Sequence, residues 1–270
     1  MADAPDPSDL LAVAVEVAAE AAQLVLAYRA DGLRDADVGT KSTATDLVTA
    51  ADRAVERLIA QRLGARRPYD RILGEEYGGS AAGAGVRWVV DPIDGTVNYV
   101  YGLPQYAVSI AAQVDGVSVA GVVRNAATGE QWTAVRDGGA WRDGVRLTGS
   151  TQTDLNQSLV ATGFGYDSAR RANQARVLAT VLPAVRDIRR FGAASIDLCL
   201  AAEGLVDAYF ERGLNPWDHA AGGLVATEAG LLVTGLRGAP PSEAMVVAAP
   251  PALHPLLHDL LADLDADAGP

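Results

Sequence analysis

The most informative part of the sequence is an apolar run that ends in two acidic residues, Trp88-Val89-Val90-Asp91-Pro92-Ile93-Asp94-Gly95-Thr96-Val97-Asn98. Short runs of branched and aromatic residues that end at polar residues are typical of strands, so residues 86–90 are predicted to form a buried strand. Asp91 stands at its carboxyl end, and Asp94 follows at the mouth of a helix. The pattern predicts two carboxylates that converge just outside the edge of a sheet, where ligands bind in open α/β folds.

Two carboxylates at such a place favour a divalent ion such as Mg²⁺. Mg²⁺ is held by one or two carboxylates and keeps waters and phosphate oxygens as its other ligands. The amides of Gly95 and Thr96 stand at the start of the helix, where unpaired N–H groups and the helix dipole attract a phosphate. Aspartate is also a common turn and cap residue, so this segment alone leaves a purely structural interpretation open.

Further acidic residues end other predicted elements. Glu75 and Glu76 follow the preceding strand, and Asp218 opens a helix. Asp46 and Thr49, at the entrance to the second predicted helix, add a carboxylate and a hydroxyl. If these points meet in space, they form a site for two or three metal ions.

The rest of the chain is predicted to form helices and short strands. Residues 10–30 and 47–63 show apolar side chains at three- and four-residue spacing, which is typical of amphipathic helices. Ser8 is the predicted cap of the first helix, and Gly64 the predicted end of the second. Further helices are predicted at 169–181, 193–203, 217–229 and from Pro255 onward. Strands are predicted at 71–74, 86–90, 108–110, 117–123, 131–135, 139–141, 159–162, 187–190, 206–210, 231–234 and 245–248.

Composition excludes several classes of protein. The 270 residues suffice for one large core or two closely packed subdomains. The chain has 34 acidic against 22 basic residues, a net charge of −12, which disfavours binding to nucleic acid or anionic lipid. Cys199 is the only cysteine, which excludes an internal disulfide and a thiolate metal cluster and fits a reducing cytoplasm.

The N-terminal segment is expected to be neither an export signal nor a membrane anchor. Residues 1–9 lack the basic region that precedes the apolar stretch of a signal peptide. The most apolar segment, residues 10–30, is interrupted by Glu16, Glu20, Gln23 and Arg29, which a membrane span does not accommodate without partners. We therefore expect a cytoplasmic protein without a membrane-spanning helix.

Taken together, the motifs resemble those of the inositol monophosphatase family of Mg²⁺-dependent, lithium-sensitive phosphatases. Three occur in order, Gly74-Glu75-Glu76, Asp91-Pro92-Ile93-Asp94-Gly95-Thr96 and Trp217-Asp218-His219-Ala220-Ala221-Gly222, and an N-terminal element runs from Lys41-Ser42 to Asp46-Leu47-Val48-Thr49. Several matches in order are more specific than any one alone. The resemblance covers nearly the whole chain, and residues 162–166 and 189–199 resemble the bacterial members.

The resemblance implies a layered α-β-α-β-α sandwich, the fold of the inositol monophosphatases and fructose-1,6-bisphosphatases. The first half, residues 1–148, would be α+β, with the N-terminal helices, an antiparallel sheet and most metal ligands. The second half, residues 149–270, would be α/β and complete the active site within one compact unit. A homodimer and sensitivity to lithium are further expectations from the family.

The resemblance also implies a ligand set of two or three Mg²⁺ ions. Glu75, Asp91 and the carbonyl of Ile93 would hold one ion. Asp91, Asp94 and Asp218 would hold a second. A weaker third ion would rest on Glu75 and water.

The catalytic roles follow from the same resemblance. Glu75 and Thr96, with Asp46 and Thr49 behind them, would orient and deprotonate a metal-activated water that attacks phosphorus directly. No phosphoenzyme is expected, because two residues separate Asp91 from Asp94, whereas one separates the aspartates of phosphatases with an aspartyl nucleophile. The implied substrate contacts are Asp94, Gly95, Thr96, Arg190, Ala194, Glu211 and Asp218.

The expected substrate is a small phosphorylated polyol, inositol 1-phosphate, hydrolysed to myo-inositol and phosphate. Phosphatases acting on histidinol phosphate, fructose 1,6-bisphosphate and 3'-phosphoadenosine-5'-phosphate share the metal motifs, so these substrates remain alternatives. An alternative of another class is a regulatory partner in a transcription complex, since some bacterial relatives are implicated in such complexes. The negative charge argues against direct contact with RNA.

Other reactive residues are assigned to structure. His254 and His258 lie one turn apart on the last predicted helix and indicate a surface role. His219 is expected to pack at a helix start, because Mg²⁺ rarely recruits imidazole, and Cys199 to lie in the core. The arginines of the helix at 169–181 are expected to face solvent, although they could guide an anionic substrate: Arg170, Arg171 and Arg176.

Overall fold

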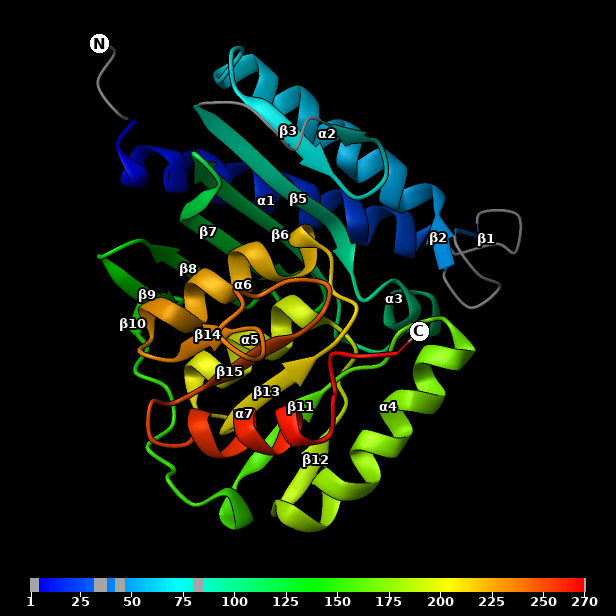
Figure 1. Ribbon diagram of the computed structural model, residues 1–270. Helices are drawn as coiled ribbons and strands as arrows, with labels where there is room; N and C mark the ends of the chain where they lie inside the picture. Colours follow the sequence, from blue (N-terminus) through cyan, green and yellow to red (C-terminus); the bar gives the residue numbers. More distant parts are fainter. Residues whose placement is uncertain (1–4, 32–37, 42–46, 80–84, 270) are drawn as a thin grey trace.

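The chain forms five alternating layers of helix and sheet, in the order α-β-α-β-α (Figure 1). The computed structural model describes residues 5–31, 38–41, 47–79 and 85–269. Helices α1 (Pro7–Ala30) and α2 (Ala50–Arg66) cover one face of an eight-stranded sheet, and α5 (Ala194–Glu203) and α6 (Pro216–Glu228) cover the other. A five-stranded sheet and α4 (Ser168–Val181) with α7 (His254–Asp263) complete the sandwich. This is the predicted fold class.

The eight-stranded sheet has the order β10-β9-β8-β7-β6-β5-β3-β4. Its strands are β3 (Arg71–Gly74), β4 (Gly78–Gly79), β5 (Val86–Asp94), β6 (Ala107–Val114), β7 (Val117–Asn125), β8 (Gln131–Val135), β9 (Gly139–Arg142) and β10 (Val145–Arg146). Every neighbouring pair is antiparallel except β3 and β5, which run parallel. A separate short pair joins β1 (Val38–Thr40) to β2 (Leu47–Thr49), and α3 (Thr96–Tyr101) follows β5. The antiparallel sheet expected for the first half is confirmed for β5 to β10.

Both N-terminal helices begin or end differently from the prediction. Asp6, not Ser8, caps α1, because its side chain accepts a hydrogen bond from the Ser8 amide at 2.9 Å. Residues 47–49 pair as a strand, so α2 begins only after its cap, Thr49. The helix continues past Gly64 to Arg66, since a glycine costs a helix only ~1 kcal/mol while the adjacent Leu63 is buried.

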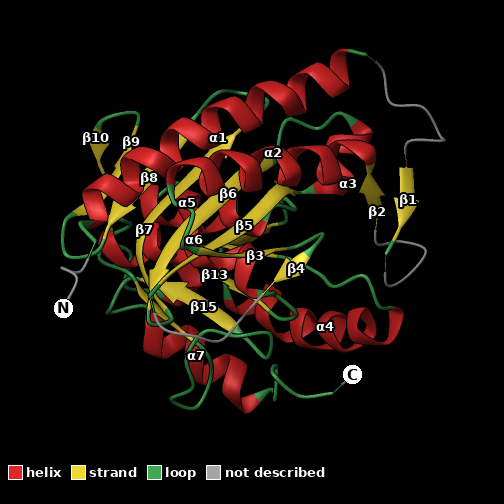
Figure 2. Cartoon of the chain, turned by 90° about the horizontal axis from the view of Figure 1, so that it is seen from above, coloured by secondary structure: helices red, strands yellow, loops and turns green. Residues whose placement is uncertain are grey.

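Helix α1 is long and apolar enough to span a membrane by length and composition. In the fold, one of its faces is buried against α2, β6 and β7, and Figure 2 shows α1 and α2 side by side over the sheet. On its other side, Glu20 pairs with Arg62 of α2 at 2.6 Å, and Glu16 pairs with Arg66. The helix is therefore a covering layer of the sheet, and the acidic residues that interrupt its apolar run have partners on α2.

The second sheet has the order β12-β11-β13-β15-β14. Its strands are β11 (Leu159–Thr162), β12 (Asp187–Arg189), β13 (Ala208–Glu211), β14 (Leu232–Thr234) and β15 (Val246–Ala249), with 3₁₀ turns at Leu155–Gln157 and Leu182–Ala184. The first three strands in the order are parallel, as expected for an α/β layer, and β15 is antiparallel to both its neighbours.

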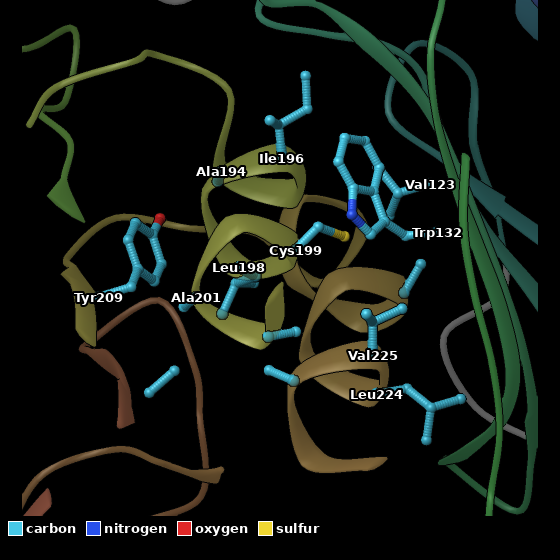
Figure 3. Packing of buried hydrophobic residues seen from close by; sticks show 14 of the residues in the cluster. Val123, Trp132, Ala194, Ile196, Leu198, Cys199, Ala201, Tyr209, Leu224 and Val225 are labelled. Atoms are coloured by element: carbon cyan, nitrogen blue, oxygen red, sulfur yellow. The ribbon is translucent and has the colours of Figure 1, made fainter. Parts of the chain in front are cut away.

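The two halves share one large hydrophobic core. Helices α5 and α6 lie between the sheets, with Trp132 of β8, Cys199 of α5 and Tyr209 of β13 in the same cluster (Figure 3). Cys199 is fully buried, which confirms its prediction as a core residue. The boundary predicted between residues 148 and 149 falls between the two sheets and stays a prediction.

Candidate active site

The parallel pairing of β3 and β5 brings the first two acidic motifs together. Gly74 is paired with Val90, and the Glu75 amide donates to the Val90 carbonyl at 3.2 Å. Because parallel strands end at the same edge of a sheet, Glu75 and Asp91 emerge side by side. Their carboxyl groups lie close enough for each to affect the pKa of the other.

The turn after Asp91 is held by its own side chain and by a glycine. Asp91 Oδ1 accepts a hydrogen bond from the Ile93 amide at 3.0 Å, and the pairing of β5 with β6 shifts register between Asp91 and Asp94. Gly95 then caps α3 with a φ of +89°. A Cβ at Gly95 would stand 2.7 Å from the Gln105 carbonyl oxygen, so only glycine fits this turn.

Asp94 is oriented by the other half of the chain. Its Oδ2 accepts two hydrogen bonds from Ser195 at the start of α5, one from the amide at 2.7 Å and one from the hydroxyl at 2.5 Å. Ala194 precedes Ser195 and is buried at the same helix end. Ser195 was not among the predicted site residues, since its contact with Asp94 spans 101 positions of the chain.

Asp218 lies at the first turn of α6. The Asn215 amide donates to its Oδ2 at 2.6 Å, which closes a capping box with the Asn215 side chain. Ser109 of β6 donates its hydroxyl to the Trp217 carbonyl at 3.4 Å and links this helix end to the first sheet. Asp218 therefore reaches the site from a helix that packs on the sheet carrying Asp91.

A buried chain of hydrogen bonds lies behind Thr96. The Thr96 hydroxyl lies 3.2 Å from Asp52 Oδ1, and the Thr49 hydroxyl and amide donate to Asp52 Oδ2 at 2.5 and 2.8 Å. Asp46 was predicted to lie behind Thr96, and Asp52 was not among the predicted site residues. Asp46 lies outside the described residues, whereas the spacing Thr49-x-x-Asp52, a capping-box pattern, was a signal that could have found Asp52.

One cavity of about 400 Å³ collects the predicted site residues. Its lining joins the ends of β3, β5 and β13 to the first turns of α3, α5 and α6. The predicted residues on its wall are Glu75, Asp91, Ile93, Asp94, Gly95, Thr96, Arg190, Ala194, Glu211 and Asp218. The acidic motifs that are separate in the sequence therefore lie together at one cavity.

Burial and mutual repulsion dominate the electrostatics of this cavity. Burial, opposed by the Lys41 ammonium, raises the pKa of Glu75 to about 7. The pKa values of Asp91 and Asp218 are raised well above the usual range, first by burial and then by the neighbouring carboxylates. Burial raises the pKa of Asp94 despite its hydrogen bonds from Ser195. Four acids at one point disfavour one another's charge unless a cation lies between them.

The donor set fits Mg²⁺. Lys41 supplies one cation at this place, with Nζ 2.7 Å from Glu75 Oε1 and a second ion pair to Glu76. Within the described ranges, no group of three or more His, Cys, Asp or Glu side chains is already arranged to hold a metal ion. An open arrangement of hard oxygen ligands matches the preference of Mg²⁺ for a few carboxylates together with water and phosphate.

Glu211 and Arg190 form a second polar region of the cavity. The Tyr209 hydroxyl donates to Glu211 Oε2 at 2.7 Å, and burial raises the pKa of Glu211 to about 7. A Cβ at Gly163 would stand 2.0 Å from the Glu211 carboxylate, so the missing side chain makes room for this acid. Similarly, a Cβ at Gly192 would stand 2.2 Å from the Arg190 guanidinium.

The histidines lie outside the cavity. His254 is buried, lies 2.8 Å from the Thr234 hydroxyl and stacks on His258, so the prediction of a surface role is wrong for His254. Leu253 and Leu257 are buried beside it, which shows that this face of α7 packs on the second sheet. Burial lowers the pKa of His219 to about 4, as expected for a packing residue.

Comparison with known proteins identifies the family. The family model described as the inositol monophosphatase family matches residues 6–266. The chain belongs to the inositol monophosphatase family. Inositol-1-monophosphatase of Mycobacterium leprae is 49% identical to it over 245 residues, 84% of each chain. The protein named Nus factor SuhB of Escherichia coli K12 is more distant, 37% identical over 232 residues, 85% of this chain and 86% of its own.

Solved structures of inositol monophosphatases have the same fold. Mycobacterium tuberculosis SuhB matches with a TM-score of 0.83 and 42% identity, over 97% of this chain and 99% of its own. The inositol monophosphatase of Thermotoga maritima matches with a TM-score of 0.86 and 27% identity, over 97% and 100%. The family's five-layer sandwich is thus the fold of this chain.

Proposed function

We propose that the protein is a Mg²⁺-dependent phosphomonoesterase that hydrolyses inositol 1-phosphate to myo-inositol and inorganic phosphate. The observation that carries the proposal is the gathering of Glu75, Asp91, Asp94 and Asp218 at the wall of one cavity, beside the hydroxyl of Thr96. The relatives that are 47–49% identical and named inositol-1-monophosphatase support the choice of substrate.

Two or three Mg²⁺ ions would be held by the acidic wall. Their ligands would be the carboxylates of Glu75, Asp91, Asp94 and Asp218 and the carbonyl of Ile93. When bound, Mg²⁺ supplies positive charge that stabilises the phosphoryl and leaving oxygens and makes a bound water more acidic. Sensitivity to lithium is proposed with this site.

Thr96 and Glu75 would position the attacking water. The Thr96 hydroxyl lies 3.2 Å from Asp52 Oδ1 and 3.0 Å from the Ile93 carbonyl oxygen. When the hydroxyl donates to Asp52, its oxygen would accept a hydrogen bond from the water. The Asp52 carboxylate, held by Thr49, keeps the Thr96 hydroxyl in this orientation. The Glu75 carboxylate accepts the second hydrogen of the water, which directs its oxygen at phosphorus for attack in line with the leaving group.

Substrate contacts would come from both halves. The amides of Gly95 and Thr96 donate to phosphate oxygens, and the carboxylates of Asp94 and Glu211 accept hydrogen bonds from polyol hydroxyls. Arg190, Ala194 and Asp218 line the rest of the polyol region. This division of roles matches a substrate with one phosphate and several hydroxyl groups.

The cellular setting is also part of the proposal. We place the protein in the cytoplasm as a homodimer, in line with its family. The net charge of −12 supports a small-molecule substrate and disfavours direct contact with nucleic acid or a membrane surface.

The test is phosphate release from inositol 1-phosphate, histidinol phosphate, fructose 1,6-bisphosphate and 3'-phosphoadenosine-5'-phosphate. We expect the highest kcat/KM for inositol 1-phosphate, and loss of turnover with a chelator or with Asp91→Asn. Asp263→Asn, the same change at an exposed position of α7, is the matched control and should keep full activity. A higher kcat/KM on another ester would correct the substrate, and Mg²⁺-independent turnover would refute the mechanism.

A second candidate function is a regulatory role in a transcription complex. The observation in its favour is the name of the Escherichia coli relative, Nus factor SuhB. Asp91→Asn separates the two functions, because it removes a carboxylate from the cavity and leaves the outer surface unchanged. A biological activity that persists in this variant would support the regulatory role.

A further inference from the structure

The three arginines predicted to face solvent on α4 differ in where they lie. Arg171 donates to the Gly165 and Tyr166 carbonyls at 3.2 and 2.7 Å, and thereby holds the preceding loop. Arg176 donates to the Asn173 side chain at 3.0 Å. Arg170 instead lines the cavity that contains the acidic wall. The prediction of a solvent-facing side chain is therefore wrong for Arg170.

Two glycines make room for the Arg170 side chain. A Cβ at Gly165 would stand 2.7 Å from Arg170 Cδ, and a Cβ at Gly213 would stand 2.5 Å from its Nη1. The arginine is thus fitted into the wall by its methylene stem and one edge of its guanidinium. Such packing fixes the direction of the guanidinium before a ligand arrives.

The guanidinium has unused capacity for hydrogen bonds. Its Nε is buried and has no hydrogen-bond partner within the part of the chain that the structure describes. Its Nη2 is paired with Glu243 at 3.3 Å, but the Glu243 side chain is 65% exposed. Buried donors are almost always satisfied in proteins, and a loose pair with an exposed acid is easily exchanged for a ligand.

The charged neighbours of Arg170 include a second arginine as well as two acids. Arg212 lies close enough for the Arg170 charge to lower its pKa, in addition to the larger effect of burial. In contrast, the arginine whose charge acts on Asp94 and Glu211 is Arg190. Among the described residues, Arg170 and Arg190 are thus the two arginines on the wall of this cavity, and Arg170 shares its part of the wall with Asp167 and Glu243. With about 400 Å³, this cavity falls in the range of ligand sites, ~300–1,000 Å³.

We propose that Arg170 binds a second phosphate group of the substrate, so that the enzyme also hydrolyses polyol bisphosphates and Arg170 sets their preference over monophosphates. The inference rests on the proposed function. In the reaction, a water oxygen bonds to the phosphorus at the acidic wall as its ester bond breaks, and the leaving oxygen takes up a proton. The second phosphate stays on the polyol, paired with the planar guanidinium, which suits phosphate geometry.

The first experiment compares kcat/KM for fructose 1,6-bisphosphate and inositol 1-phosphate. We expect Arg170→Ala to lower the ratio of the two values about 10- to 100-fold, the effect of losing a charged hydrogen bond. Arg176→Ala, which removes the same charge from the same helix, should leave the ratio unchanged. Glu243→Gln should raise the ratio several-fold, because it removes the acid that competes with the phosphate. An equal loss on both esters in Arg170→Ala would overturn the proposal.

The second experiment measures binding without turnover. Fructose 6-phosphate, the product that keeps only the second phosphate, is titrated calorimetrically into the wild type and into Arg170→Ala. We expect binding at least ~10-fold weaker in the variant, and equal affinities would overturn the proposal. If the wild type hydrolyses neither ester, the proposed function fails, but the titration still decides the role of Arg170. Arg170→Gln, which keeps the stem on Gly165, replaces the alanine variant if that variant does not fold.

Discussion

Ser195 holds the Asp94 carboxylate through two hydrogen bonds to the same oxygen, from its amide at 2.7 Å and from its hydroxyl at 2.5 Å. The two residues come from opposite halves of the chain. Asp94 Oδ2 is therefore occupied by α5, while Asp94 lines the cavity. The orientation of a proposed metal ligand thus depends on how the second half docks on the first.

Ser195→Ala is expected to lower kcat about 10-fold, because one of the two hydrogen bonds that fix Asp94 is lost. The free energy of unfolding should fall by only about 1 kcal/mol. Steady-state kinetics and urea unfolding check the two values. Ser168→Ala, at the exposed start of α4, is the control. A loss of kcat no larger than in the control would show that the amide alone suffices.

Asp52→Asn is expected to lower kcat by at least ~10²-fold, the scale of a lost proton-transfer network. The uncharged amide has a single acceptor oxygen, so it cannot accept hydrogen bonds from both the Thr49 and the Thr96 hydroxyls as the two carboxylate oxygens do. The Thr96 hydroxyl therefore loses its orientation. Asp46→Asn is the informative comparison, because the sequence assigned this role to Asp46. If Asp46→Asn costs more activity than Asp52→Asn, the assignment to Asp52 is wrong.

Gly163→Ala is expected to raise KM for inositol 1-phosphate about 10-fold, because the new methyl group displaces the Glu211 carboxylate. Gly64→Ala is the matched control. Apart from its chain neighbours and the nearby backbone of α2, no atom of the described chain lies within 4 Å of the Cβ that this change adds. The control should keep KM and gain ~0.5–1 kcal/mol of stability. An unchanged KM in Gly163→Ala would mean that Glu211 does not bind the polyol.

Asp197 is expected to make stability depend on pH. Asp197 is fully buried. Among the described residues, neither of its carboxyl oxygens has a hydrogen-bond partner of normal geometry. Burial raises the pKa of this carboxyl group well above 3.8. The folded state therefore binds the proton more tightly than the unfolded state. Above pH 3.8 the stability from this residue is lost as the pH rises towards its folded pKa.

Asp197→Asn removes this titration, so the variant should lose less stability than the wild type as the pH rises above about 4. Urea unfolding at several pH values measures the difference. Asp263→Asn, an exposed change of the same kind, should follow the wild type. Parallel curves for wild type and Asp197→Asn would show that Asp197 is ionised and paired in the folded protein.

The sequence predicted the acidic wall because each of its members ends an element. Strand ends and helix starts are local properties, so Glu75, Asp91 and Asp218 were identifiable without knowledge of the contacts between them. That they meet follows from the pairing of β3 with β5 and from the packing of α6 on the first sheet.

The site residues that sequence reasoning did not predict are of two kinds. Some make contacts with residues far away in the sequence, and one belongs to a sequence pattern that has both a structural and a functional role. Ser195 reaches Asp94 across 101 positions, and Arg170 enters the cavity only because Gly165 and Gly213 lack side chains. Asp52 is both a capping residue of α2 and the partner of Thr96, and its helical role hides the other. His254 was misplaced because amphipathicity alone does not show which face of α7 is covered.

The acidic wall forms only when β3 and β5, the parallel pair of the first sheet, are aligned in the correct register. Side chains alternate between the faces of a strand, so a slip of β3 by one residue against β5 would reverse Leu73 and move Glu75 away from Asp91. A chain misaligned in this way could remain compact and helical, yet it would have an incomplete acidic wall. Specific activity therefore measures the fraction of molecules with correctly aligned strands, which circular dichroism does not distinguish.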